Sequence, residues 1–209
     1  MKILLIGATG MIGSRILAEA VGRGHTVIAA TRHAPKKADT SGKVTEKMLD
    51  ATNARAIAAA AAGADVIVSG TSPRGGGDAI AEAAAVGDAL IEAAGIASKR
   101  LFVVGGAGSL TFPDGKPVAE TVPEPYRKES LGMRGVRDKL KASNINWTFF
   151  SPAGLISPGA LTKKYRLGST VLLMDSQGKS HISAEDYAHA VVDELERPKH
   201  QRAQFTIGY

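Results

Sequence analysis

The residues with the clearest chemistry form a glycine-spaced motif close to the N-terminus. Gly7, Gly10 and Gly13 recur at every third position, directly after the apolar run Lys2–Ile6. Between a strand and a helix, such glycines let the chain turn sharply, let backbone N–H groups approach a phosphate, and let the helix pack closely on the sheet. We therefore expect a pyrophosphate-binding turn at the N-terminus of a helix, made by Gly7, Thr9, Gly10, Met11, Ile12 and Gly13.

An ordinary strand-to-helix turn can carry the same three glycines. The context favours the phosphate site, because the motif follows a strand, opens a helix predicted over residues 11–23, and leads into a second apolar run at 26–30. A strand, glycine turn, helix and strand in this order are typical of a dinucleotide-binding unit.

The end of the second apolar run indicates which dinucleotide is bound. A site selective for NAD usually places Asp or Glu there, to accept hydrogen bonds from the ribose hydroxyls. Here Thr31, Arg32 and His33 follow the run, and the first acidic residue is Asp39. Arg32 has the charge and the forked donors that suit a 2′-phosphate. We expect NADP(H) to be preferred, with NAD(H) possible; a solvated basic loop is the alternative.

Strand and helix patterns alternate along the chain, which predicts an α/β fold with a Rossmann-like, doubly wound parallel sheet and helices on both faces. We treat residues 1–209 as one NAD(P)-binding domain, with about 155–209 adding a small cap. Further strands are expected at 44–48, 64–69, 100–104 and 147–150, and helices at 53–62, 78–94 and 126–142. In the cap we expect a hairpin of 165–167 with 171–174, a capping box at 183–186 that opens a helix to 196, and a last strand at 205–207.

In such a sheet the ligand lies beyond the carboxyl ends of the strands. Asp50 could accept a hydrogen bond from the adenine amino group, although an exposed strand end is an equal alternative. The remaining loops at this edge are expected to pass the ribose and the nicotinamide, and the residues that we assign to them are Gly70, Thr71, Ser72, Gly105, Gly106, Ser151, Pro152 and Ala153.

Composition narrows the class of protein further. The chain has no cysteine, which excludes disulfides and thiol catalysis, and its five histidines lack metal-ligand spacing, so no metal is expected. The net charge is +6 and the isoelectric point about 9.6, but the basic residues are scattered, so we expect no nucleic-acid partner. No apolar run approaches the ~20 residues that span a bilayer, and no secretory signal is evident. We expect a cytoplasmic protein without a membrane partner, either a monomer or a homodimer.

Six segments together resemble a known family over nearly the whole chain. The chain resembles the atypical short-chain dehydrogenase/reductases of the NAD(P)H-binding, NmrA-like group, more closely bacterial proteins assigned as NADH-flavin reductases, and more distantly biliverdin reductase B. This resemblance implies a flavin (FMN or FAD) or a quinone-like small molecule as a transient electron acceptor. The segments that carry it are 7–13, 103–110, 147–153, 164–168, 182–188 and 205–209.

One feature of the superfamily is missing. Most members pair a tyrosine with a lysine four residues later, but Tyr126 is followed at that spacing by Ser130. Ser109 and Tyr126 are the candidate catalytic pair, and packing or capping at a helix start is the alternative for Tyr126. Reducing a carbonyl needs a proton donor, whereas hydride transfer to a flavin needs chiefly correct placement, since water can supply the proton.

Three functions follow. The first is an NADPH-dependent flavin or quinone reductase, whose open face could be lined by Arg74, Arg134, Arg137 and Tyr165. The second is a non-catalytic NADP(H)-binding redox sensor of the NmrA type, which the missing lysine also favours. The third is a carbonyl reductase or epimerase that works without the tyrosine–lysine pair, and the short cap leaves it little room for a nucleotide sugar.

Overall fold

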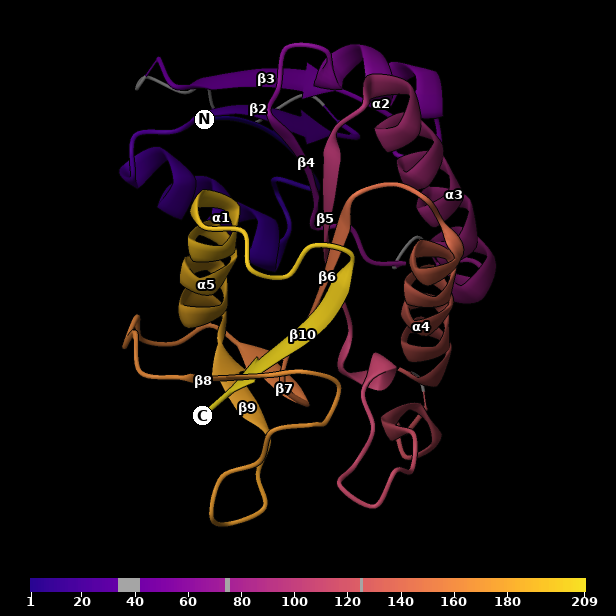
Figure 1. Cartoon of the computed structure of the whole chain (residues 1–209), viewed down its shortest axis with the longest axis vertical. Helices are drawn as coiled ribbons and strands as arrows, with labels where there is room; N and C mark the ends of the chain where they lie inside the picture. Colours follow the sequence, from indigo (N-terminus) through magenta and orange to yellow (C-terminus); the bar gives the residue numbers. More distant parts are fainter. Residues whose placement is uncertain (34–41, 74–75, 125) are drawn as a thin grey trace.

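An eight-stranded sheet forms the centre of the computed structural model (Figure 1), which describes residues 1–33, 42–73, 76–124 and 126–209. The strand order is β3-β2-β1-β4-β5-β6-β10-β8, and every pair is parallel except the antiparallel pair of β8 with β10. A separate two-stranded parallel sheet joins β7 to β9. The order reverses between β1 and β4, so this doubly wound sheet has its switch point there. The predicted Rossmann-like fold class is confirmed.

The elements agree closely with the predicted ranges. The strands are β1 (Lys2–Ile6), β2 (Thr26–Thr31), β3 (Val44–Met48), β4 (Val66–Ser69), β5 (Arg100–Val104), β6 (Trp147–Ser151), β7 (Leu155–Ser157), β8 (Arg166–Gly168), β9 (His181–Ser183) and β10 (Ala203–Gly208). The helices are α1 (Met11–Gly22), α2 (Ala54–Ala61), α3 (Ala79–Ala97), α4 (Arg127–Ala142) and α5 (Ala184–Glu196), with short 3₁₀ turns η1 (Ala107–Ser109) and η2 (Val118–Glu120).

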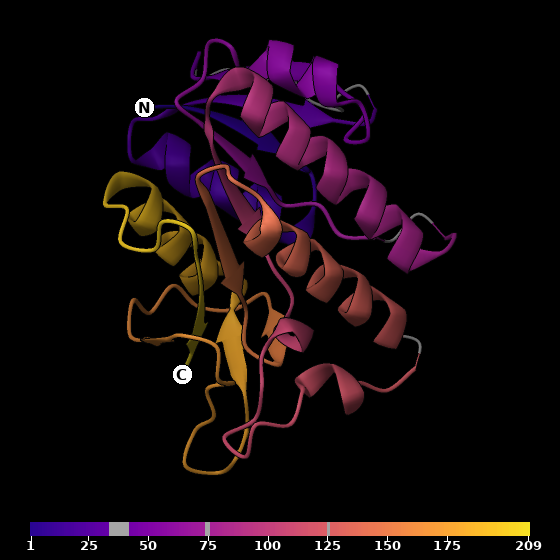
Figure 2. The same ribbon diagram turned by 45° about the vertical axis from the view of Figure 1, so that its right-hand side comes forward.

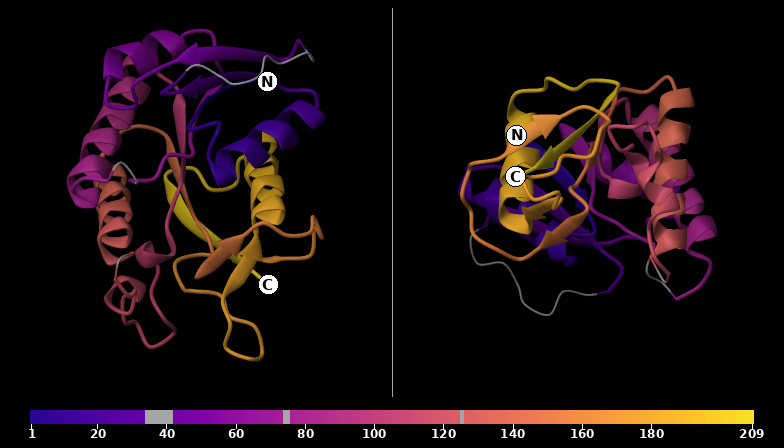
Figure 3. Two further views of the ribbon diagram at one scale, coloured as in Figure 1. Left: turned by 180° about the vertical axis from the view of Figure 1, so that it is seen from behind. Right: turned by 90° about the horizontal axis from the view of Figure 1, so that it is seen from below.

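Two helical layers cover the sheet. Helices α1 and α5 lie on one face and α2, α3 and α4 on the other, with the sheet between them (Figures 1 and 3). Successive side chains of a strand point to opposite faces, so Ile3 and Leu5 pack toward α1 and α5 while Leu4 and Ile6 pack toward the other layer. Because helices cover both faces of the sheet, every buried residue of β1 is apolar, and apolar and polar residues do not alternate along this strand.

Helices α3 and α4 lie side by side (Figure 2). A methyl group at Gly132 of α4 would lie 2.9 Å from the Cβ of Ala83 and from the carbonyl oxygen of Ala79. Small residues therefore set the close approach of the two helices. Several alanines of α3 are buried inside the chain: Ala83, Ala89, Ala93 and Ala94.

The C-terminal region contributes more to the core than a cap would. Strand β10 joins the main sheet beside β6, and α5 packs against α1. The predicted hairpin is wrong: β8 pairs with β10, and residue Val171 instead bridges to Thr111. Strand β10 has an open edge that offers a full ladder to β8, whereas the predicted hairpin would give residues 166–168 only a local partner.

The start of α5 holds the segment that precedes it. The Ser183 hydroxyl accepts a hydrogen bond from the Asp186 N–H at 3.0 Å, as the capping motif predicted. The Asp186 side chain does not return this bond. It is buried and accepts hydrogen bonds from Thr162 (N–H and hydroxyl), the Lys163 N–H and the Tyr209 hydroxyl. The carboxylate therefore ties the 162–163 loop and the C-terminus to α5.

No helix within the described ranges combines the length and the apolar composition needed to cross a bilayer.

Candidate functional site

A cleft of about 600 Å³ opens at the carboxyl ends of the six strands β1 to β6. It brings together most of the residues that the sequence assigned to the cofactor. Those that line it are Gly7, Thr9, Gly10, Met11, Ile12, Thr31, Arg32, Asp50, Gly70, Thr71, Ser72, Gly105, Gly106, Pro152 and Ala153. Three assigned residues, Gly13, His33 and Ser151, are not part of its lining.

The glycine motif forms the floor of the cleft between β1 and α1. Gly7 has φ of +84°, a conformation that side chains rarely adopt, and this lets the chain leave the strand at once. Gly13 lies in the first turn of α1, where a Cβ would be 2.0 Å from the Gly7 carbonyl oxygen. Gly13 therefore acts from behind the cleft, because it permits the helix to start close against the turn.

The N-terminus of α1 meets the cleft at Gly10. This residue is the N-cap, its backbone is extended, and no side chain in the described residues caps the helix. The first turn of α1 also has no acidic residue. Unpaired N–H groups and the positive end of the helix dipole are thus available to an anion at this position.

Arg32 lines the cleft where β2 ends. The Thr31 hydroxyl donates to the His33 carbonyl oxygen at 2.6 Å, which bends the chain directly around Arg32. Thr31 and His33 therefore shape the turn, and of the three it is Thr31 and Arg32 that reach the cleft. Arg32 supplies a guanidinium where an NAD-selective site has a carboxylate.

Asp50 lies close to Arg32 and remains ionised. Its Oδ1 accepts hydrogen bonds from the Thr52 N–H at 2.9 Å and the Thr52 hydroxyl at 2.8 Å. These two bonds, with a smaller contribution from the charge of Arg32, lower the pKa of Asp50. Thr52 was not predicted, yet it lines the cleft and orients the Asp50 carboxylate as an acceptor.

Ser109, one of the two candidate catalytic residues, is buried beneath the cleft. It is 2 % exposed and is not part of the cleft lining. Its hydroxyl donates to the Gly106 carbonyl oxygen at 2.7 Å and lies 2.8 Å from the Ser151 hydroxyl. The Gln204 side chain donates to both serine hydroxyls at 3.0 Å. This network joins the 3₁₀ turn η1 to β6 and β10, so Ser109 and Ser151 support the cleft from beneath its lining.

Tyr126, the other candidate, does line the cleft and is 62 % exposed. It occupies the N-cap of α4, and its side chain makes no capping hydrogen bond. Packing or capping at a helix start was the expected alternative role, and although Tyr126 lies at the helix start, its side chain forms no cap and is mostly exposed. The structure gives Ser109 and Tyr126 opposite surroundings, one buried and bonded, the other open to solvent.

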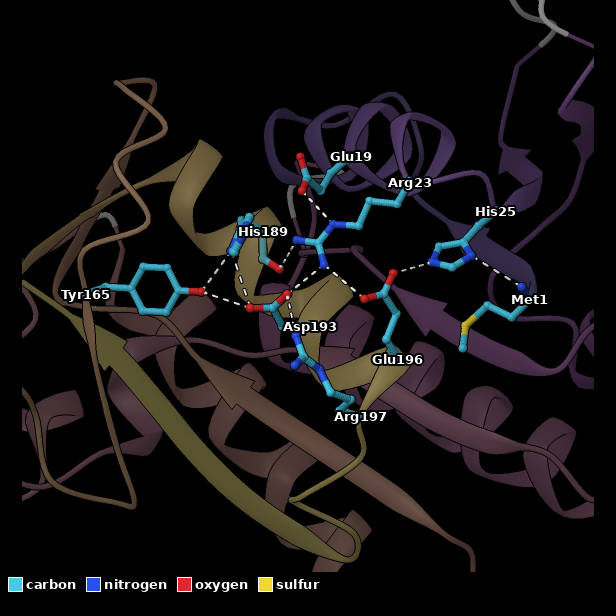
Figure 4. Close-up of polar contacts among 9 residues, drawn as sticks. All are labelled: Met1, Glu19, Arg23, His25, Tyr165, His189, Asp193, Glu196 and Arg197. Carbon is cyan, nitrogen blue, oxygen red and sulfur yellow. Dashed lines mark hydrogen bonds and ion pairs between the residues drawn. The ribbon is translucent and has the colours of Figure 1, made fainter.

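The residues expected to line the open face of the cleft lie outside its lining or outside the described residues. Arg134 and Arg137 are not part of the cleft lining, and Arg137 donates to the Ser109 carbonyl oxygen at 2.5 Å. Arg74 lies outside the described residues. Tyr165 belongs to a polar cluster of α1 and α5, where its hydroxyl is 2.9 Å from His189 and donates to Asp193 (Figure 4). Burial, with the Asp193 charge, raises the pKa of Tyr165 to about 12.

One wall of the cleft was not predicted. It is built by the facing sides of α3 and α4 with the end of β5, and its apolar members are Ala83, Val86, Leu90, Val103, Met133 and Val136. Ser130 also lines this wall. These residues lie at ordinary helical core spacing, so their sequence does not distinguish a cleft wall from a buried helix contact.

Comparison with known proteins agrees with this geometry. The profile of a family described as NAD(P)H-binding matches residues 7–198. The chain is 43% identical to a candidate exported protein of Burkholderia pseudomallei, with a TM-score of 0.89 and full coverage of both chains. It is 38% identical to a candidate epimerase of Bacteroides thetaiotaomicron, with a TM-score of 0.93 over 100% of this chain and 96% of the other.

A third solved structure is more distant in sequence. The chain is 29% identical to a candidate NADH-flavin reductase of Streptococcus pneumoniae, with a TM-score of 0.87 over 100% of this chain and 99% of the other. The three likenesses extend over the whole fold, although the functions in their names differ.

Proposed function

This chain belongs to the NAD(P)H-binding family, and we propose that it is an NADPH-preferring oxidoreductase that reduces a flavin or a quinone-like acceptor. The observation that carries the cofactor preference is Arg32 in the cleft lining at the end of β2. A guanidinium binds a 2′-phosphate through charge and paired donors, and it offers no acceptor to ribose hydroxyls.

The remaining cleft residues fit a dinucleotide. The uncapped start of α1 suits the pyrophosphate. Asp50 offers an ionised acceptor beside Arg32, and Pro152 with Ala153 closes the cleft beyond β6. A bound NADPH would supply a hydride, and the chain would supply its orientation and a partly apolar environment.

The acceptor class is inferred from the missing tyrosine–lysine pair. The residue four positions after Tyr126 is Ser130, where most of the superfamily has lysine. Ser109 is buried, and its hydroxyl is hydrogen-bonded to Gly106 and Ser151. A carbonyl substrate or an epimerised sugar needs a group that moves a proton at the reacting carbon or oxygen. A flavin or quinone takes a hydride at an electron-poor ring and can take its proton from water. This argument favours the activity named for the Streptococcus relative over the one named for the Bacteroides relative.

Titration of the purified protein with NADPH and NADH, followed by NADPH oxidation with FMN, FAD and menadione in the same buffer, tests the proposal. We expect NADPH to bind more tightly than NADH and turnover to depend on the acceptor. Equal binding of the two cofactors would contradict the Arg32 assignment.

A redox sensor is the second candidate, because the absent tyrosine–lysine pair suits a protein that binds NADP(H) without chemistry. It predicts tight NADPH binding and no turnover with any of the three acceptors.

A further inference from the structure

Ser130 has a buried hydroxyl without a partner. Among the described residues, three buried side-chain polar atoms lack a hydrogen bond: Ser130 Oγ, Trp147 Nε1 and Gln204 Oε1. Of these three residues, Ser130 is the one that lines the cleft. A buried hydroxyl that gives up water without gaining a partner costs free energy. Because Oγ has almost no exposed surface, a ligand in the cleft reaches it only when the Ser130 side chain rotates, and that ligand then supplies the partner that the fold does not.

The helix itself offers Ser130 a partner that the side chain does not use. Serine in a helix commonly bonds to a carbonyl oxygen of the preceding turn, and Ser143, the C-cap of α4, makes such a bond to Leu140 at 2.7 Å. The Ser130 Oγ instead lies against the turn that follows β5. It is 1.6 Å from the position that a Cβ would occupy at Gly108, so only glycine leaves room for it there.

The surroundings of Ser130 suit the electron acceptor better than the cofactor. The glycine turn, Arg32 and Asp50 make up the dinucleotide part of the cleft. Ser130 belongs instead to the wall between α3 and α4, whose other members include Met133, Val136, Val86 and Leu90. Met133 follows Ser130 by three residues, so the two lie on one face of α4. An apolar wall with one hydroxyl fits a flat aromatic ring that carries a carbonyl group.

We propose that the Ser130 hydroxyl donates a hydrogen bond to a ring carbonyl oxygen of the acceptor, and that the wall between α3 and α4 holds its aromatic ring. Ser130 is then a specificity-determining residue that favours flavins and quinones over purely apolar rings. This inference rests on the proposed function for its acceptor class, and on the unpartnered hydroxyl for its residue.

The test combines binding with turnover. Riboflavin binding to the protein saturated with NADP⁺ is followed by quenching of flavin fluorescence, and KM is measured with riboflavin and menadione as acceptors. In Ser130→Ala we expect the riboflavin Kd and both KM values to rise about fivefold to tenfold, the scale of one hydrogen bond. The NADP⁺ Kd is expected to stay unchanged, and the Tm of the ligand-free protein not to fall, because no internal hydrogen bond is removed.

Two further variants serve as controls. Ser130→Thr keeps the hydroxyl and should keep Kd near the native value. Ser143→Ala removes a C-cap hydroxyl that is bonded to the Leu140 carbonyl oxygen of α4, so it should lower Tm and leave riboflavin binding unchanged.

Gly108→Ala tests the same contact from the other side. The added methyl would lie 1.6 Å from Oγ and 2.9 Å from Cβ of Ser130, so the hydroxyl must move and riboflavin should bind more weakly. Combining Gly108→Ala with Ser130→Ala removes the collision at 1.6 Å but keeps the contact at 2.9 Å with the Cβ of residue 130, so the loss of riboflavin binding in the double variant should be smaller than the sum of the two single losses.

Failure of the proposed function and failure of the Ser130 inference would give different results. If the native protein binds riboflavin but does not oxidise NADPH, the proposed function fails while the Kd series still tests Ser130. An unchanged riboflavin Kd in Ser130→Ala, or a loss confined to NADP⁺ binding, would overturn the inference.

Discussion

The carbonyl oxygen of Gly7 lies 2.0 Å from the position that a Cβ would occupy at Gly13. Both atoms belong to the backbone or are fixed to it, so a side chain at residue 13 cannot be accommodated by a rotamer change. The contact couples the turn that leaves β1 to the first turn of α1. It also explains why a residue outside the cleft lining is needed for the shape of the cleft.

The first prediction concerns this contact. Gly13→Ala should push α1 away from the turn and cost about 1–3 kcal/mol of stability, as overpacking does, with at least tenfold weaker NADPH binding. Urea denaturation and NADPH titration measure the two effects. Gly22→Ala is the matched control in the same helix: no atom lies within 4 Å of its added methyl, so stability should be unchanged or slightly higher. A native NADPH affinity in Gly13→Ala would refute the role of this contact.

Arg32 sets the expected cofactor preference. Arg32→Ala should weaken NADPH binding by about 1.5–3 kcal/mol, the scale of hydrogen bonds to a charged group, and leave NADH binding nearly unchanged. Isothermal titration with both cofactors measures the difference. Arg55→Ala, an exposed arginine outside the cleft, controls for the loss of one positive charge. A similar loss for both cofactors would mean that Arg32 does not recognise the 2′-phosphate.

Tyr126 distinguishes reduction of a flavin from reduction of a carbonyl. Tyr126→Phe removes a mostly exposed hydroxyl at the start of α4. If water supplies the proton, kcat with FMN should change by less than about threefold. General acid catalysis contributes typically 10²–10⁴-fold, so a loss of that size would show that Tyr126 is a catalytic acid. Steady-state NADPH oxidation decides between the two results.

Asp186 makes the stability of the fold depend on pH. Burial alone would raise the pKa of this carboxyl, but hydrogen bonds from Thr162, Tyr209 and Lys163 outweigh it and lower the pKa. Because the folded-state pKa lies below the unfolded value of about 3.9, this stabilisation is present above about pH 4 and is lost as pH falls through the folded-state pKa.

Asp186→Asn should therefore lower stability at pH 7 by about 1–3 kcal/mol and flatten its decline in acid. Urea denaturation from pH 7 to pH 3 measures both effects. Asp88→Asn, which alters an exposed carboxylate of α3 paired with Lys139, should change stability by less than about 1 kcal/mol. A decline in acid as steep in Asp186→Asn as in the native protein would contradict the prediction.

Local patterns in the sequence were sufficient for most of the fold and for the placement of most of the assigned residues at one cleft. The glycine spacing, the continuous apolar strands and the residue at the end of β2 are all local signals. Each reports a constraint on the backbone within a few residues, such as the positive φ of Gly7. In a doubly wound sheet the strand ends converge by topology alone, so residues far apart in the chain could be assigned to one edge.

Only the tertiary structure decided the rest. The sequence could not show that Ser109 is enclosed by Ser151 and Gln204, because their contact joins η1, β6 and β10, which are separated along the chain. Nor could it show that β8 pairs with β10, or that Ser130 lies unpaired in the wall between α3 and α4. Helical periodicity identifies a face of a helix but not its neighbour, and whether a buried hydroxyl finds a partner depends on atoms that only folding brings together.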